Sequence, residues 1–562
     1  MSDPVRLARE RAGVPDTIDV AECQSLIEAF EQACHRYRDR PAFSCMGQAL
    51  SYAELDRLSA NFAAWLQHDT PLQPGDRIAV QLPNLLQYPV VVFGAMRAGL
   101  VVVNTNPLYT EREMRHQFRD SGAKALVILA NMADKLPAVL PDTEIGLVVI
   151  TEVGDLHSAP KRWLINSVLR YIKRAVPKVG IRGVVSLRKA LSSGQQHAFT
   201  PVVSHADTLA VLQYTGGTTG VSKGAMLSHG NLVANTLQSA AIFATYGFKP
   251  DGSGEALVLP LPLYHIYAFI VSMIMVVTGN ETVLIANPRD IRGFVRALKS
   301  VKMAGFCGLN TLFVALCRDP DFAALDFSHL RVTVSGGMAL TQGAAEHWKA
   351  ITGSDIHEGY GLTETSPVVA VNPGGGNQLG TVGIVVPSTE VCTQDAAGTV
   401  LAIGEAGELC VRGPQVMQGY WQRPEETAKV LDAKAWLHTG DVAIIQADGY
   451  VRIVDRMKDM ILVSGFNVYP NEVEDVISRH PDVLECAVIS VPDEHSGEAV
   501  KAVVVAKNPS LSSETVRQWC KQQLAAYKVP KHVEFRDSLP KSAVGKVLRR
   551  ELRDGSAVEP PA

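Results

Sequence analysis

The sequence lacks the cysteine spacing of a zinc ribbon or a disulfide scaffold. Its 9 cysteines are scattered and odd in number, and none forms a CxxC or CxxxC pair. Reduced thiols in a cytosolic protein, used as small core side chains, fit this pattern better. A large charge excess is also missing, since 53 Lys and Arg oppose 57 Asp and Glu. This balance excludes a globally basic nucleic-acid-binding protein and a highly charged disordered chain.

Long apolar runs are missing as well. The longest, residues 268–277, is interrupted by Ser272 and is about half as long as a membrane span. Residues 1–20 are polar and charged, without the apolar core of a secretory signal. We therefore expect a cytoplasmic protein.

Short runs rich in valine, isoleucine and leucine recur along the 562 residues. Residues 77–82, 125–129, 146–150 and 209–213 are examples, and helical patterns lie between several of them. This alternation is typical of an α/β protein with a parallel sheet, and the length allows three or four domains or compact subdomains. After an antiparallel strand predicted at 449–454, the pattern indicates a compact α+β unit. We place the boundary between residues 457 and 458.

One stretch has a strongly uneven charge. Residues 161–189 contain nine basic residues and no acidic one. Within this stretch Ile165, Val168, Leu169 and Ile172 have the spacing of one apolar helical face. Two interpretations stay open: a surface helix packed on its own domain, or contact with an anionic membrane surface.

The most informative segment is residues 214–229, YTGGTTGVSKGAMLSH. A predicted strand leads into a loop with four glycines, three threonines, Ser222 and Lys223. Glycines let backbone N–H groups approach an anion closely, the hydroxyls add donors, and the lysine adds a positive charge. This composition predicts a loop that binds a polyphosphate.

Three other motifs could in principle account for these residues. A Walker A loop requires Gly-Lys-Ser/Thr, whereas Lys223 follows Ser222 and precedes Gly224, and a GxGxxG motif is absent here. Residues 220–224 formally match the GxSxG motif of serine hydrolases, but a Gly/Thr stretch separates Ser222 from the strand end. A hydrolase nucleophile and a plain glycine-rich surface loop remain alternatives.

Five segments in order resemble the motifs of the acyl-adenylate-forming superfamily, which contains acyl-CoA synthetases, luciferases and adenylation domains. They are the glycine-rich segment, GYGLTE at 359–364, HTGD at 438–441, DRMKDMIL at 455–462 and PKSAVGK at 540–546. Residues 437–473, LPLYHI at 261–266 and GPQVMQGYWQRP at 413–424 further resemble the bacterial long-chain fatty-acid–CoA ligases among its members. The whole chain is similar to one such ligase.

The resemblance implies that a fatty acid, ATP and CoA give acyl-CoA, AMP and diphosphate through an acyl-adenylate, with Mg²⁺ as cofactor. It also implies a large N-terminal domain of packed α/β subdomains with a β-barrel-like subdomain, residues 1–457. A small α+β domain, residues 458–562, would rotate after adenylation. The product would feed β-oxidation or lipid synthesis. Alternatives are a medium-chain or aryl acid, or a carrier protein as acceptor; a homodimer and contact with the inner membrane surface are further expectations.

The resemblance also assigns roles around the triphosphate. The implied phosphate-binding residues are Thr215, Gly216, Gly217, Thr218, Thr219, Gly220 and Lys223. Glu364 with Thr218 would bind Mg²⁺, and Thr363 would donate to the α-phosphate. Gly359 and Tyr360 would hold the adenine, Asp441 would accept from the ribose hydroxyls, and Arg456 would contact the ribose or a phosphate.

Lys546, in PKSAVGK, is implied to be the catalytic lysine, which neutralises charge developing on the carboxylate and the α-phosphate. Lys458 occupies the hinge position. In the thioester state, after the rotation, Gly465 would line the path of the CoA pantetheine arm, where a side chain would block a narrow tunnel.

The implied acyl site involves three further residues. His265 would lie near the substrate carboxylate as a catalytic residue. Gly336 and Gly337 would let the substrate pass between the acyl pocket and the nucleotide. Small residues within 268–272 and 305–308 would leave room for a long acyl chain.

Overall fold

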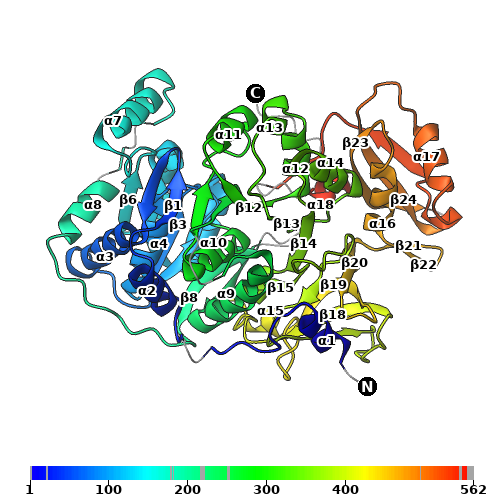
Figure 1. Cartoon of the computed structure of the whole chain (residues 1–562), viewed down its shortest axis with the longest axis horizontal. Helices are drawn as coiled ribbons and strands as arrows, with labels where there is room; N and C mark the ends of the chain where they lie inside the picture. The colour runs from blue at the N-terminus through cyan, green and yellow to red at the C-terminus, as the bar shows by residue number, and fades with distance from the viewer. Residues whose placement is uncertain are drawn as a thin grey trace.

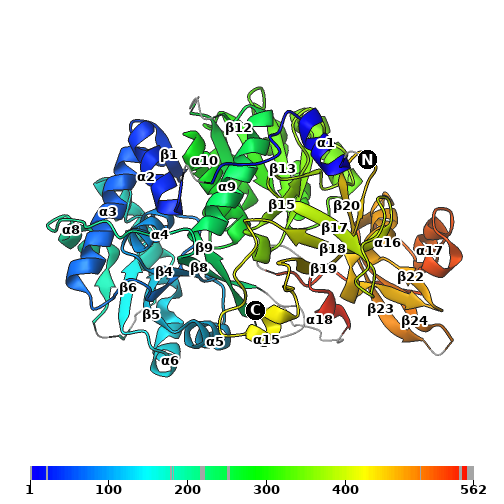
Figure 2. The same cartoon turned by 90° about the horizontal axis from the view of Figure 1, so that it is seen from below.

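The computed structural model describes residues 3–20, 23–177, 180–181, 183–215, 222–249, 254–493, 495–542 and 547–553. Figures 1 and 2 show a large body and, at one end of the molecule, a smaller unit formed by the C-terminal elements. The predicted α/β body and α+β C-terminal unit are thus confirmed.

A seven-stranded sheet forms the part of the body farthest from the C-terminal unit (Figure 1). Its strands, in spatial order, are β7 (Val185–Ser186), β6 (Leu147–Thr151), β5 (Ala123–Leu129), β3 (Arg77–Gln81), β4 (Val101–Asn104), β8 (Leu209–Thr215) and β9 (Lys223–Ser228). All neighbours are parallel except β8 and β9, which are antiparallel. The four strands predicted from their apolar runs are confirmed, and β9 lies in the second half of the glycine-rich segment.

A nine-stranded sheet forms the second layer. Its order is β16 (Ile384–Val385), β15 (Val368–Val371), β14 (Ile356–Gly361), β13 (Val332–Gly336), β12 (Met303–Gly308), β10 (Ala256–Leu259), β11 (Glu281–Leu284), β1 (Pro41–Cys45) and β2 (Gln48–Ser51). The strands from β14 to β1 run parallel. Their carboxyl ends therefore meet at one edge, which is where α/β sheets bind ligands.

Apolar helices join the two sheets in one shared core. The main ones are α2 (Leu26–Arg36), α3 (Tyr52–Asp69), α4 (Gln87–Arg97), α9 (His229–Phe243) and α10 (Ile266–Thr278). Every residue of α4 and nearly every residue of α10 is buried. A helix that is apolar on all sides belongs in a core, which explains the apolar run at 268–277. Among the described helices none is long and apolar enough to cross a membrane.

The body contains further helices outside this group. They are α1 (Pro4–Arg11), α5 (Glu111–Ser121), α6 (Leu136–Val139), α7 (Ala159–Ser167), α8 (Leu187–Gly194), α11 (Ile291–Leu298), α12 (Asn310–Cys317), α13 (Pro320–Ala323), α14 (Gln342–Thr352) and α15 (Pro424–Ala428).

An antiparallel sheet lies where a barrel-like subdomain was expected. Its strands are β17 (Glu390–Gln394), β18 (Ala406–Arg412), β19 (Leu437–Ile445) and β20 (Val451–Arg456), in that order. The C-terminal unit follows, with β21 (Ile461–Val463), β22 (Phe466–Val468), β23 (Val483–Asp493), β24 (Gly497–Ala506), β25 (His532–Phe535), α16 (Pro470–Ser478), α17 (Ser513–Lys521) and α18 (Arg549–Arg553). The expected boundary falls in a short turn, Met457–Asp459.

The basic stretch projects from the body as α7, which continues into a π-helical turn, Val168–Ile172 (Figure 1). No residue of either element is buried. Trp163, Tyr171 and Ile172 are 72%, 73% and 75% exposed. The single packed apolar face expected from the spacing is therefore incomplete, because large apolar side chains of this segment face solvent.

Candidate active site

A cleft of about 3700 Å³ lies between the body and the C-terminal unit. The predicted residues that line it are Thr215, Lys223, His265, Gly336, Gly337, Gly359, Tyr360, Thr363, Glu364, Asp441 and Arg456. Gly216, Gly217, Thr218, Thr219, Gly220 and Lys546 lie outside the described residues. Three parallel strands, β8, β13 and β14, reach this cleft with their carboxyl ends.

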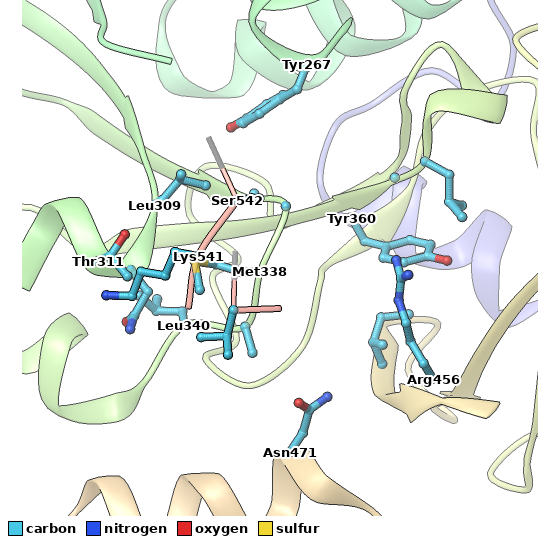
Figure 3. A pocket seen from close by; sticks show the side chains of 18 of the residues that line it. Tyr267, Leu309, Thr311, Met338, Leu340, Tyr360, Arg456, Asn471, Lys541 and Ser542 are labelled. Atoms are coloured by element: carbon cyan, nitrogen blue, oxygen red, sulfur yellow. The ribbon is translucent and has the colours of Figure 1, made fainter. Parts of the chain in front are cut away.

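Asp441 of β19 lies at the centre of a cluster of polar side chains. Tyr360 Oη donates to Asp441 Oδ2 at 2.6 Å, and Arg456 Nε lies 3.2 Å from Asp441 Oδ1. Burial, with Asp441 nearby, raises the pKa of Tyr360 well above its usual range, so the phenol remains a donor. Figure 3 shows the tyrosine ring and the Arg456 side chain next to each other in the cavity. The site thus holds a carboxylate in a fixed orientation beside an aromatic ring.

Glu364 is oriented by a tyrosine from the segment GPQVMQGYWQRP. Tyr420 Oη donates to Glu364 Oε1 at 2.6 Å. Lys223 lies over the Tyr420 ring, with Nζ 5.1 Å from its centroid, and pairs with Glu426 of α15. Lys223 and Lys429 lower the pKa of Glu426 to about 2. The carboxylate of Glu364 is half-buried in the cleft, and a hard oxygen donor there fits Mg²⁺.

Gly336 and Gly337 lie where β13 ends at the cleft. A Cβ on Gly336 would meet the Tyr267 ring at 3.0 Å, and Gly337 has φ +83°. Both positions therefore favour glycine for steric reasons. The Tyr267 hydroxyl is buried beside Cys307, and Figure 3 shows it directed into the cavity. Tyr267 was not predicted from the sequence, although it follows the LPLYHI segment directly.

His265 is the N-cap residue of α10 and lines the cleft. Its Nδ1 accepts from the Tyr267 backbone N–H at 3.3 Å. This bond fixes the ring at the helix N-terminus, close to the tyrosine that packs on Gly336.

Ser222 does not have the setting of a hydrolase nucleophile. It precedes β9, whereas the GxSxG nucleophile lies between a strand and a helix. His116 Nε2 donates to the Ser222 carbonyl oxygen at 3.1 Å, so this imidazole contacts the backbone of Ser222. The local fold therefore argues against the hydrolase alternative.

One expectation about glycines needs correction. A Cβ on Gly305 would meet Leu257 and Phe248 at 3.0 Å, and one on Gly308 would meet Phe313 at 2.6 Å. Core side chains fill this space, so residues 305–308 do not leave room for an acyl chain. Gly465 lies in the exposed turn between β21 and β22 with φ +86°. Its role on the pantetheine path concerns the state after the C-terminal domain rotates and stays a prediction.

An ion-pair network at the boundary between body and C-terminal unit was not predicted. Arg549 of α18 bonds Glu474 at 2.8 Å and lies 3.4 Å from Asp459 and 3.8 Å from Asp455 of β20. Burial raises the pKa of Asp455 to about 6, although Arg549 opposes this shift. The network ties the last described helix to the strand that carries Arg456. Ser542 and Val547, the described residues on either side of 543–546, both line the cleft.

Two family models of known proteins match most of the chain. Residues 30–421 match the family model "AMP-binding enzyme", and residues 472–546 match "AMP-binding enzyme C-terminal domain". The chain belongs to the AMP-binding enzyme family.

Among curated relatives, the long-chain-fatty-acid–CoA ligase of Escherichia coli O157:H7 is 50% identical over 98% of both chains. That of Haemophilus influenzae is 47% identical over 97% of both. Among solved structures, ATP-bound MatB from Rhodopseudomonas palustris superposes with a TM-score of 0.80 at 30% identity, covering 94% of this chain and 98% of that one.

Proposed function

We propose that this protein is an ATP-dependent, Mg²⁺-requiring long-chain fatty-acid–CoA ligase. It joins a fatty acid to CoA through an acyl-adenylate and supplies acyl-CoA for β-oxidation or lipid synthesis. The observation that carries the proposal is the convergence of the five ordered motifs on one cleft, wherever their residues are described. The names of the nearly full-length relatives support the substrate class.

Apolar residues in the lining of the same cleft support the choice of a long acyl chain. Helices α9 and α10 contribute Phe243, Val271 and Ile274 to its lining, and Leu309 and Val334 add to it. Burying a methylene group contributes about 0.8 kcal/mol, so an apolar wall favours long chains over short ones. In this assignment the chain lies along α10 and the carboxylate lies near His265.

The polar residues then act on the nucleotide. Asp441 accepts from the ribose hydroxyls, Tyr360 packs against the adenine, and Arg456 holds Asp441 and contacts the ribose or a phosphate. Glu364, oriented by Tyr420, and Thr218 are the residues proposed to hold Mg²⁺, which supplies positive charge against the phosphates. Lys223 is paired with Glu426. When ATP binds, a phosphate would therefore replace the Glu426 carboxylate as the anionic partner of Lys223.

A panel of acids tests this function. We expect pyrophosphate release with palmitate to exceed release with octanoate or benzoate, and AMP release to require CoA. Faster turnover of octanoate or benzoate would contradict the long-chain assignment, and AMP release independent of CoA would contradict the thioester step. Ser222→Ala serves as a control that should retain most ligase activity, because only the backbone of Ser222 has an assigned contact.

We further propose that α7 and the π-helical turn bind an anionic membrane surface. Exposed Trp163, Tyr171 and Ile172 can enter the interface, while Lys173 and Arg174 contact lipid phosphates. Arg170 forms an ion pair with Glu152, and this pair holds the Arg170 side chain against the body.

Charge neutralisation tests the membrane contact. Replacing Arg170, Lys173 and Arg174 with Gln should weaken co-sedimentation with phosphatidylserine vesicles by about 100-fold, since each basic residue contributes about 1 kcal/mol. Matched replacement of exposed Lys299, Lys302 and Lys349 should leave binding unchanged. Equal binding by both triple variants would contradict the proposal.

A further inference from the structure

A cluster of potential metal ligands lies on the antiparallel sheet of β17, β18 and β19. Cys392 is directly opposite Cys410 in the β17–β18 pair, and Cys410 is directly opposite His438 in the β18–β19 pair. Opposite residues in antiparallel strands lie close and on one face of the sheet. Glu408, two residues before Cys410, belongs to the same face. The register therefore brings two thiols, an imidazole and a carboxylate together.

The distances in this cluster are those of a coordination shell. Cys410 Sγ lies 3.5 Å from His438 Nδ1, and His438 Nδ1 lies 3.1 Å from Glu408 Oε2. The ligand atoms of these three residues all lie within 4.8 Å of one another. A tetrahedral Zn²⁺ with bonds of about 2.3 Å to sulfur and about 2.0 Å to nitrogen or oxygen separates S from N by about 3.5 Å and N from O by about 3.3 Å. The Cys410–His438 and Glu408–His438 separations match these values.

The surroundings also suit a bound cation. Cys410 is buried, whereas the side chains of His438 and Glu408 are 29% and 20% exposed, so an ion can enter from solvent. Glu408 Oε1 accepts from the Gly440 N–H at 3.0 Å, which fixes the carboxylate. Cys392, opposite Cys410 in the strand pair, is the fourth candidate ligand, although it lies outside the group of three whose ligand atoms are all within 4.8 Å of one another. Its Sγ accepts from Gln394 Nε2 at 3.7 Å. None of these four residues lines the cleft.

We propose that Glu408, Cys410 and His438, completed by Cys392, form a Zn²⁺ site separate from the active site. Binding would release the thiol protons as thiolate–metal bonds form. Three of the ligands belong to β18 and β19, and Asp441 lies three residues after His438. Zinc would therefore brace the strand that carries the ribose-binding carboxylate.

Metal titration of the reduced, metal-free full-length protein tests the site. We expect one Co²⁺ per chain, with a thiolate-to-cobalt charge-transfer band that Zn²⁺ abolishes by displacement. Cys410→Ser and His438→Gln should each weaken binding at least 10-fold, and Cys392→Ser should reduce the band. The matched control Cys317→Ser, which changes a partly exposed thiol elsewhere, should bind like the unchanged protein.

Absence of the charge-transfer band in the unchanged protein would overturn the proposal, as would equal binding by Cys410→Ser and the control. Thermal unfolding gives a second measurement that does not depend on the stability of any variant. Since a ligand that binds only the folded state raises Tm with its concentration, Zn²⁺ should raise the Tm of the unchanged protein. A Tm that does not change with Zn²⁺ would equally overturn the site. Neither readout depends on ligase activity.

Discussion

Lys546→Ala is expected to lower the rate of acyl-adenylate formation by about 10²–10³-fold, the usual loss when one charge-stabilising group is removed. Its ammonium would neutralise charge that builds between the carboxylate and the α-phosphate. Fatty-acid-dependent exchange of labelled pyrophosphate into ATP measures this step. Conversion of supplied acyl-adenylate to acyl-CoA should change little, because the lysine is assigned only to the first step.

Lys531→Ala is a matched control in the same C-terminal unit. Lys531 is half-exposed and pairs with Asp493, and it does not line the cleft. In Lys531→Ala, the rate of pyrophosphate exchange into ATP should remain at the level of the unchanged protein. A similar loss in both variants, or a Lys546→Ala enzyme with normal exchange, would contradict the role assigned to Lys546.

Asp441→Asn is expected to lower kcat/KM for ATP by about 100-fold. The carboxylate is buried and receives both Tyr360 and Arg456, so an amide would leave one of these donors without an acceptor, at a cost of about 2–3 kcal/mol. The asparagine would also lack one of the two carboxylate oxygens that are assigned to the ribose hydroxyls. Steady-state kinetics at saturating palmitate and CoA measure the effect.

Asp448→Asn provides the comparison on the same sheet. Asp448 accepts from the Tyr450 N–H and from Gln378 outside the cleft, so its replacement should leave the KM for ATP unchanged. Tyr360→Phe combined with Asp441→Asn should lose less than the sum of the single losses, because the two groups share one bond. Additive losses, or an unchanged kcat/KM for ATP in Asp441→Asn, would argue against the assignment.

Much of the fold follows from local sequence patterns. The apolar runs at 77–82, 125–129, 146–150 and 209–213 correspond to β3, β5, β6 and β8, because parallel strands buried on both faces need continuous apolar sequence. The run at 268–277 is a buried helix because it is too short to span a bilayer and apolar on every side. The amphipathic prediction at 165–172 is less accurate, since a π-helical turn changes the residue spacing there.

Other features depend on contacts that sequence spacing does not reveal. Gly305 and Gly308 are small residues, but Phe248 and Phe313 occupy the space beside them. Tyr267 approaches Gly336 from a different element, and Tyr420 reaches Glu364 across 56 positions in the chain. Such contacts are set by side-chain packing and strand register.

The sequence by itself determined the family, the order of the motifs and the residue types assigned to phosphate, ribose and metal, because glycine, carboxylate and lysine chemistry is local to each motif. Only the tertiary structure decided that these motifs share one cleft, that Tyr360 and Arg456 hold Asp441, and that Ser222 precedes a strand. It also decided that Cys392, Cys410 and His438 form one row, although no short spacing links them. The physical reason is that chain folding brings distant positions together through sheet register, and scattered cysteines become neighbours only in that register.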